Sequence, residues 1–219
     1  NKLGSGLSAE LDRALTASDA GAGQFFLNGA DTKTSGADVI ATWQNPWLNG
    51  DLTLTFAANI TKTSVDDLYT PRGSSLHHIP AEDIFSKQDI SIIEEWQPQD
   101  RVNLTALYKK NKLTVNVALN RYGEYTITDG QRQTYGAELL ADLRIHYQLN
   151  DSLSVNVGGN NLFDVYPDKN RIGNSRSGTI IDEQGNTVVN STGVFTYSRR
   201  SAPFGFNGAY YYAGLTYQF

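Results

Sequence analysis

The 219-residue sequence contains no cysteine and no methionine. The missing cysteines exclude a disulfide framework, a thiolate metal site and a cysteine nucleophile. Long apolar segments are missing as well, because no run of about 18 apolar residues is present, which excludes a transmembrane helix. Basic residues are in the minority, with 18 Lys and Arg against 23 Asp and Glu and a net charge of -5. An acidic balance of this kind argues against nucleic acid as a partner.

Catalytic motifs are also absent. The sequence holds no Gly-x-Ser-x-Gly elbow, no His-Glu-x-x-His pair and no phosphate-binding loop. His77 and His78, with Glu82 and Asp83 nearby, have metal-ligating chemistry. Adjacent residues on an extended chain point apart, so exposed loop histidines are the simpler interpretation. We therefore expect that the protein is not an enzyme. We also expect no catalytic residue, no cofactor and no metal site.

What the sequence does contain is alternation of apolar and polar residues, seen most clearly at the C-terminal end. A period of two predicts a β-strand, and a strand with one apolar face must place that face against a protein core or against lipid. One face of residues 207–219 carries Ala209, Tyr211, Ala213, Leu215, Tyr217 and Phe219.

Six further alternating segments complete the pattern, and their connections alternate in length. Short turns are predicted at residues 45–50, 109–112 and 150–151, and long connections at 64–98, 123–134 and 161–206. Outer-membrane barrels have short periplasmic turns and long extracellular loops. The pattern predicts an all-β fold, an antiparallel transmembrane β-barrel, with a soluble β-sandwich or lipocalin-like barrel as the alternative. The predicted strands are about residues 25–44, 51–62, 101–109, 112–122, 135–149, 152–160 and 207–219.

The predicted strand at residues 135–149 has the length and the ends expected of a membrane strand. Tyr135 and Tyr147 mark the two ends of its apolar face, as aromatic girdles mark the two interfaces of a bilayer. Its other face is polar. We expect the side chains of that face to lie on the lumen wall of the barrel, with a relay of charged groups as the alternative. The residues of that polar face are Glu138, Asp142, Arg144 and His146.

Seven predicted strands are an odd number, whereas single-chain bacterial barrels have an even number. The last strand follows a long connection and runs inward, which places Phe219 on the periplasmic side. The same reasoning places residues 1–23 outside the cell. We therefore expect the C-terminal portion of a larger barrel, with residues 1–23 as an extracellular loop and residues 24–219 as strands and loops.

Three segments resemble TonB-dependent outer-membrane receptors. Asn-Asn-Leu-Phe-Asp at residues 160–164 with Tyr166, and the run at residues 203–219, look like the C-terminal end of these receptors. Residues 28–38, Asn-Gly-Ala-Asp-Thr-Lys-Thr-Ser-Gly-Ala-Asp, are similar to a stretch common in their barrels. The resemblance implies a barrel of about 22 strands around an N-terminal plug, and the plug domain is not in this chain. It also implies that Phe219 is an assembly signal and that residues 161–164 are structural.

Candidate ligand-binding residues lie in the predicted extracellular loops. Guanidinium groups pair bidentately with carboxylates, so the loop arginines suit an anionic ligand such as a ferric siderophore, although lipopolysaccharide phosphates would also suit them. Loop aromatics such as Phe195 suit stacking on a ligand or packing within the loops. The candidates are Tyr69, Arg72, His77, His78, Arg171, Arg176, Tyr197 and Arg199.

The resemblance implies a receptor in the outer membrane of a Gram-negative bacterium that takes up a scarce solute, most simply an iron-siderophore or similar chelate. Its expected partners are the remaining N-terminal barrel and plug, a TonB-type periplasmic energy transducer, outer-membrane lipid and lipopolysaccharide, and the small solute. A passive porin-like or adhesin-like barrel without a plug is the first alternative, and a soluble β-sandwich binding module is the second.

Overall fold

The structure is a computed structural model that describes residues 28–70, 81, 85–129, 131–170, 179–181, 187–189, 195–198 and 200–219. The predicted extracellular loop at residues 1–23 lies outside these ranges. The chain forms two compact units, one of Asn1–Thr34 with Thr63–Glu94 and one of Ser35–Lys62 with Glu95–Phe219. The second unit contains most of the main sheet and the C-terminus.

A seven-stranded antiparallel sheet dominates the structure, as the alternating pattern predicts. Its order is β1-β2-β3-β4-β7-β8-β11, so sheet neighbours follow one another along the chain and β1 and β11 form the two edges. The seven predicted strands are confirmed, with ends that differ by a few residues. The strands are β1 (Ala30–Trp47), β2 (Gly50–Leu68), β3 (Asp100–Lys110), β4 (Leu113–Tyr122), β7 (Glu138–Gln148), β8 (Leu153–Asn160) and β11 (Tyr210–Tyr217).

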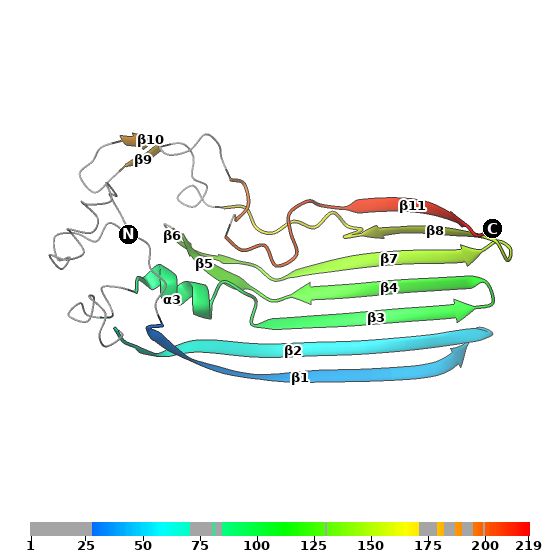
Figure 1. Ribbon diagram of the computed structural model, residues 1–219, viewed down its shortest axis with the longest axis horizontal. Coiled ribbons are helices and arrows are strands. Elements are labelled where there is room, and N and C mark those ends of the chain that lie inside the picture. Colours follow the sequence, from blue (N-terminus) through cyan, green and yellow to red (C-terminus); the bar gives the residue numbers. More distant parts are fainter. Residues whose placement is uncertain are drawn as a thin grey trace. The chain divides into compact units, whose positions relative to one another are not determined.

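Short turns join alternate strands at one end of the sheet, the end where the C-terminus also lies (Figure 1). Leu48 and Asn49 have φ values of 51° and 61°, the left-handed pair that a two-residue hairpin turn requires. The two-residue hairpin predicted at Asn150–Asp151 is wrong. Asn150 instead accepts hydrogen bonds from the backbone N–H groups of Ser152 (3.0 Å) and Leu153 (2.9 Å), so its side chain shapes a longer turn.

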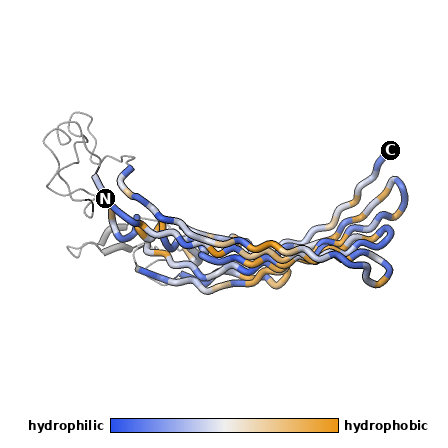
Figure 2. Tube along the Cα trace, turned by 90° about the horizontal axis from the view of Figure 1, so that it is seen from below, coloured by the Kyte–Doolittle hydropathy of each residue, from blue (hydrophilic) through white to orange (hydrophobic). Residues whose placement is uncertain are grey.

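Apolar side chains from the sheet strands line up in rows across one face. The register places Val115 of β4 opposite Tyr108 of β3 and Ile145 of β7, and Val157 of β8 opposite Ile145 and Ala213. Figure 2 shows the result as an apolar band across the middle of the strands, with hydrophilic residues toward both ends. Many of these side chains are exposed, including Val157 at 49% and Leu215 at 69%.

This exposed apolar face decides between the fold alternatives. A β-sandwich buries the apolar face of each sheet against a second sheet. Here many apolar side chains of the main sheet are exposed, and no second sheet covers them in the part of the chain that the structure describes. The soluble β-sandwich alternative is therefore wrong, and a face of this kind suits lipid.

Two small hairpins lie outside the main sheet. One is formed by β9 (Thr179–Ile181) and β10 (Thr187–Val189), and the other by β5 (Tyr125–Asp129) and β6 (Gln131–Tyr135). The β5–β6 hairpin lies where the sequence predicts a loop, at residues 123–134. The predicted strand over residues 135–149 is shorter at its N-terminal end, because Tyr135 belongs to β6. The long strand β7 begins at Glu138, and residues 136 and 137 separate it from β6. The backbone N–H of Gly136 donates to Asp168 Oδ2 at 2.7 Å. Tyr135 belongs to β6 and is 1% exposed, so it does not mark an end of the apolar face.

The one helix among the described elements, α3 (Lys87–Glu94), was not predicted. Its sequence signal is Ser86 followed three residues later by Asp89, a reciprocal cap. The Asp89 carboxylate accepts from the Ser86 N–H at 2.8 Å, and the Asp89 N–H donates to Ser86 Oγ at 3.3 Å. Within the described residues, no helix is long and apolar enough to cross a membrane.

Candidate functional site

The polar face of the main sheet carries a row of hydrogen-bonded side chains. Asn103 Nδ2 on β3 donates to Asn120 Oδ1 on β4 at 2.7 Å, and Asn120 Nδ2 donates to Asp142 Oδ2 on β7 at 3.1 Å. The second oxygen of Asp142 accepts from the backbone N–H of Asn161, at 2.8 Å, just beyond β8. The side chains of neighbouring strands on this face therefore satisfy one another's hydrogen-bonding groups.

A concavity of about 510 Å³ lies at the long-connection half of this polar face. On one side, Asn59 Nδ2 donates to Asp38 Oδ1 at 2.6 Å. On the other, the guanidinium of Arg101 lies 4.5 Å from the centroid of the Tyr122 ring, a cation–π contact. The Arg101 side chain is exposed, so the contact orients the charge while leaving its donors available to a solute.

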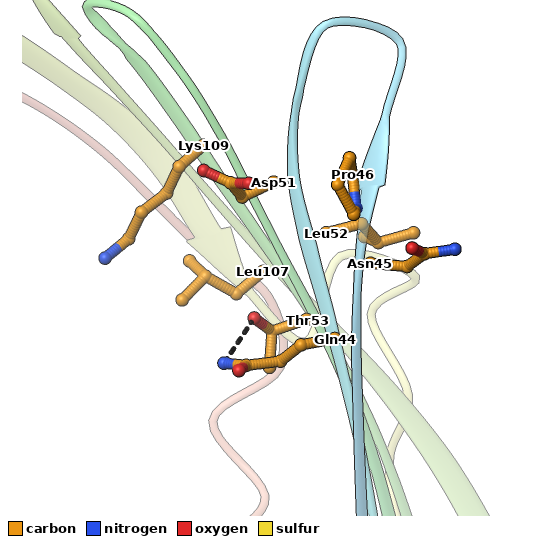
Figure 3. Close-up of a pocket in the computed structure, with 8 residues that line it drawn as sticks. All are labelled: Gln44, Asn45, Pro46, Asp51, Leu52, Thr53, Leu107 and Lys109. Carbon is orange, nitrogen blue, oxygen red and sulfur yellow. Dashed lines mark hydrogen bonds between the residues drawn. The ribbon is translucent and has the colours of Figure 1, made fainter.

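A second concavity of about 440 Å³ lies near the short-turn end, between β1, β2 and β3. Figure 3 shows Gln44 and Thr53 side by side in its lining, joined by a hydrogen bond of 3.2 Å from Gln44 Nε2 to Thr53 Oγ1. Asp51 and Lys109 occupy opposite positions in the β2–β3 register and line the same concavity. The polar face thus offers charged groups of both signs at this end.

The β5–β6 hairpin has a core of its own. Tyr125 and Tyr135 stack with ring centroids 5.0 Å apart, and Trp96 and Ile127 complete the buried cluster. Ser201 Oγ donates to the Trp96 carbonyl at 2.6 Å, and Arg132 pairs with Glu95 at 2.6 Å. Segments that are far apart in sequence therefore meet at this hairpin.

Asn170 organises the next part of the same loop cluster. Its Oδ1 accepts from the Tyr135 hydroxyl at 2.6 Å, and its Nδ2 donates to the carbonyls of Phe195 (2.9 Å) and Tyr197 (2.8 Å). Its backbone N–H donates to the carbonyl of Thr196 at 2.7 Å. Sequence reasoning missed Asn170, because nothing local in the sequence distinguishes it from other loop asparagines.

The segment Asn161–Asp164 forms the corner between β8 and the following connection. Asn161 and Asp164 have φ values of 51° and 56°, and the side chain of Asn161 exchanges hydrogen bonds with the backbone of Val165 at 2.8 and 2.9 Å. Asp164 Oδ1 accepts from the backbone N–H of Ala209 at 2.8 Å. The pKa of the Tyr166 hydroxyl is raised, mainly by its hydrogen bond with Asp164.

Of the predicted ligand-binding residues, the structure describes Tyr69 and Tyr197. The ring of Tyr197 stacks on Tyr166 at 5.6 Å and on Phe206 at 5.9 Å. Tyr69 is 40% exposed, and its N–H donates to the Gly29 carbonyl at 2.8 Å. The other candidates lie outside the described residues: Arg72, His77, His78, Arg171, Arg176 and Arg199.

Asp142 does not take part in a relay along β7. Its carboxylate accepts hydrogen bonds from Asn120 and Asn161 instead. Arg144 and His146 lie opposite Asn116 and Thr114 in the register. Where side chains are described, no group of three or more His, Asp and Glu is placed to hold a metal ion. Phe219 is fully exposed at the chain end, and its ring contacts Tyr217 at 5.8 Å.

Two solved structures similar to the chain are outer-membrane receptors bound to pyoverdine or its ferric form. A ferripyoverdine receptor of Pseudomonas aeruginosa bound to ferripyoverdine is 19% identical, with a TM-score of 0.48, over 85% of this chain and 20% of the receptor. The pyoverdine receptor FpvA of P. aeruginosa PAO1 bound to pyoverdine is 15% identical, with a TM-score of 0.44, over 87% of this chain and 27% of the receptor. The chain thus spans about a fifth to a quarter of these receptors.

Comparison with functionally curated proteins gave no match. The family model of the TonB-dependent receptor-like β-barrel matches residues 10–162, well over half of the chain. The matched region includes β1 to β8, with the polar row and both concavities. The chain belongs to the TonB-dependent receptor-like β-barrel family.

Proposed function

We propose that the chain is the C-terminal part of the barrel of an outer-membrane receptor that takes up an iron-siderophore or similar anionic chelate. The observation that carries this proposal is the division of one sheet into an apolar outer face and a hydrogen-bonded polar face with a concavity at Arg101. The polar face lines the lumen, because lumen-facing and lipid-facing residues alternate along a membrane strand.

The rest of the receptor would supply the further strands that close the barrel and the plug inside it. In lipid an unpaired sheet edge is costly, since every backbone polar group needs an internal partner. Strands β1 and β11 are the edges of the described sheet, so we place further barrel strands beside both. A plug inside the completed barrel and a TonB-type periplasmic transducer would couple solute entry to energy.

The short turns lie on the periplasmic side in this proposal, and the long connections outside the cell. Residues 1–23 then form an extracellular loop, and lipid and lipopolysaccharide surround the barrel. Arg101 and the candidates in the long connections, Arg72, Arg171, Arg176 and Arg199 among them, would contact the chelate through charge-assisted hydrogen bonds.

Uptake measurements test the proposal. Cells that carry the full-length protein, cells that lack it and cells that lack the TonB-type transducer are given iron-55 bound to siderophores of different classes. We expect accumulation of at least one chelate that needs both the protein and the transducer. Entry that needs the protein but not the transducer would instead support the passive porin-like alternative, and no entry of any chelate would refute siderophore uptake.

The role of Arg101 is tested in the same cells. We expect Arg101→Gln to weaken chelate binding by about 10- to 100-fold, since a charge-assisted hydrogen bond contributes about 1.5–3 kcal/mol. Lys110→Gln, at the short-turn end of the same strand, is the matched control and should leave binding unchanged.

A further inference from the structure

The hydroxyl of Tyr125 is a buried polar group without a partner. The Tyr125 side chain is 3% exposed, and its hydroxyl is the one buried side-chain polar atom with no hydrogen bond within the described part of the chain. Buried polar groups are nearly always hydrogen-bonded in proteins, so an orphan of this kind points to a missing ligand or water.

Two carboxylates act electrostatically on this hydroxyl. Tyr125 pairs with Tyr135 in the hairpin, and the next residue, Gly136, donates its N–H to Asp168 Oδ2 at 2.7 Å. Glu138 follows two residues later as the first residue of β7, and Asp168 lies within electrostatic reach of it. Burial is the largest cause that raises the pKa of the orphan hydroxyl, and Tyr135, Asp168 and Glu138 act in the same direction.

Two arginines of this region contact other side chains. Arg132 pairs with Glu95 at 2.6 Å, and Arg101 lies over the Tyr122 ring. The N–H of Gly136 is the hydrogen-bond donor that faces Asp168. Two carboxylates within electrostatic reach of each other and of a buried hydroxyl make a positive charge favourable here.

We propose that Glu138, Asp168 and Tyr125 form a site for a calcium-like divalent cation. The two carboxylates are direct ligands, and the Tyr125 hydroxyl bonds a water molecule of the cation's coordination shell. Calcium fits this set because it takes six to eight oxygen ligands in flexible geometry and accepts water among them. The set holds no imidazole or thiolate, which transition metals prefer.

Such a cation would hold the long connections together. It would join Glu138, at the start of β7, to Asp168, in the connection that follows β8. Asn170, two residues beyond Asp168, already ties that connection to Tyr135 and to the carbonyls of Phe195 and Tyr197. The cation would therefore fix one loop cluster at a second point.

Terbium binding to the full-length protein tests the site. Terbium substitutes for calcium and emits light when a nearby tyrosine is excited, and the protein is first purified in detergent and stripped of cations with a chelator. We expect tyrosine-sensitised emission that calcium competes away. Glu138→Gln and Asp168→Asn should each weaken terbium binding by about tenfold, because affinity follows the number of charged ligands. Asp151→Asn, an exposed acid in the short turn before β8, is the matched control and should bind as the wild type does.

Tyr125→Phe separates a ligand role from a packing role, since it keeps the stacked ring and removes only the hydroxyl. We expect weaker terbium binding, with emission still sensitised through Tyr135. Without cation, the variant should be at least as thermally stable as the wild type, because the orphan group is gone. Equal terbium affinity in the wild type, Glu138→Gln and Asp168→Asn would overturn the proposal, as would emission that millimolar calcium does not reduce. Heat-modifiable migration on gels verifies that each variant is folded.

Discussion

Asp164 Oδ1 accepts a hydrogen bond of 2.8 Å from the backbone N–H of Ala209, 45 residues further along the chain. The bond closes the base of the long connection between β8 and β11. The Tyr211 hydroxyl adds a second tie, a hydrogen bond of 2.9 Å to the Leu162 carbonyl. The corner therefore sets where β11 begins, independently of the path that the connection takes.

Gly208→Ala tests this corner. Gly208 has a φ of 74°, and an added Cβ would lie 2.5 Å from Asp164 Oδ1 and even closer to the Tyr166 hydroxyl. Left-handed backbone costs an alanine about 1–2 kcal/mol, and the clash adds about 1–3 kcal/mol. Urea unfolding in lipid vesicles measures the loss. Gly205→Ala is the matched control, because Gly205 has a φ of 80° with nothing within 4 Å of its Cβ position. Equal losses in the two variants would show that the corner contributes nothing.

Leu143→Arg tests which face meets lipid. Leu143 lies opposite Val117 in the apolar rows, and an arginine near the bilayer midplane costs about 2–4 kcal/mol. We expect the variant to unfold at lower urea concentration or to assemble poorly. Ala118→Arg is the control, since Ala118 lies on the polar face opposite Asp142 and gains an opposite charge. If the control were the more damaging change, the two faces would be assigned the wrong way round.

Asn170→Ala is expected to loosen the loop cluster without unfolding the sheet. It removes the acceptor of the Tyr135 hydroxyl and the donor to two carbonyls, and each buried partner left unsatisfied costs about 1–3 kcal/mol. Limited proteolysis of intact cells should cut the long connections faster, while heat-modifiable migration stays normal. Asn150→Ala, in a short turn, should leave those cleavage rates unchanged.

Deletion of Phe219 is expected to reduce the amount of assembled protein but not the stability of the molecules that do assemble. The Phe219 side chain is fully exposed and contacts only the neighbouring ring of Tyr217 among the aromatic pairs of the described residues. Its loss therefore removes little packing. Quantitative blotting of outer membranes measures the amount, urea unfolding measures the stability, and Gln218→Ala serves as control. Normal amounts after the deletion would refute an assembly role.

The sequence by itself determined the seven strands and their two faces. An alternation of period two needs no tertiary information, because successive side chains on any strand point to opposite sides. The turn within residues 45–50 was also visible as a local pattern, whereas the structural role of residues 161–164 followed from the resemblance to TonB-dependent receptors. The alternation of short and long connections is also a pattern of the sequence, and the structure places the short turns together at one end of the sheet.

Only the tertiary structure decided the loop cluster. Tyr135 continues the alternating pattern of β7 in the sequence, yet it lies in β6, stacked on Tyr125 and bonded to Asn170. Trp96 and Ser201 meet there across 105 positions of sequence. Local propensity cannot show such partners, because burial of these rings and satisfaction of their polar atoms depend on segments that only the folded chain brings together.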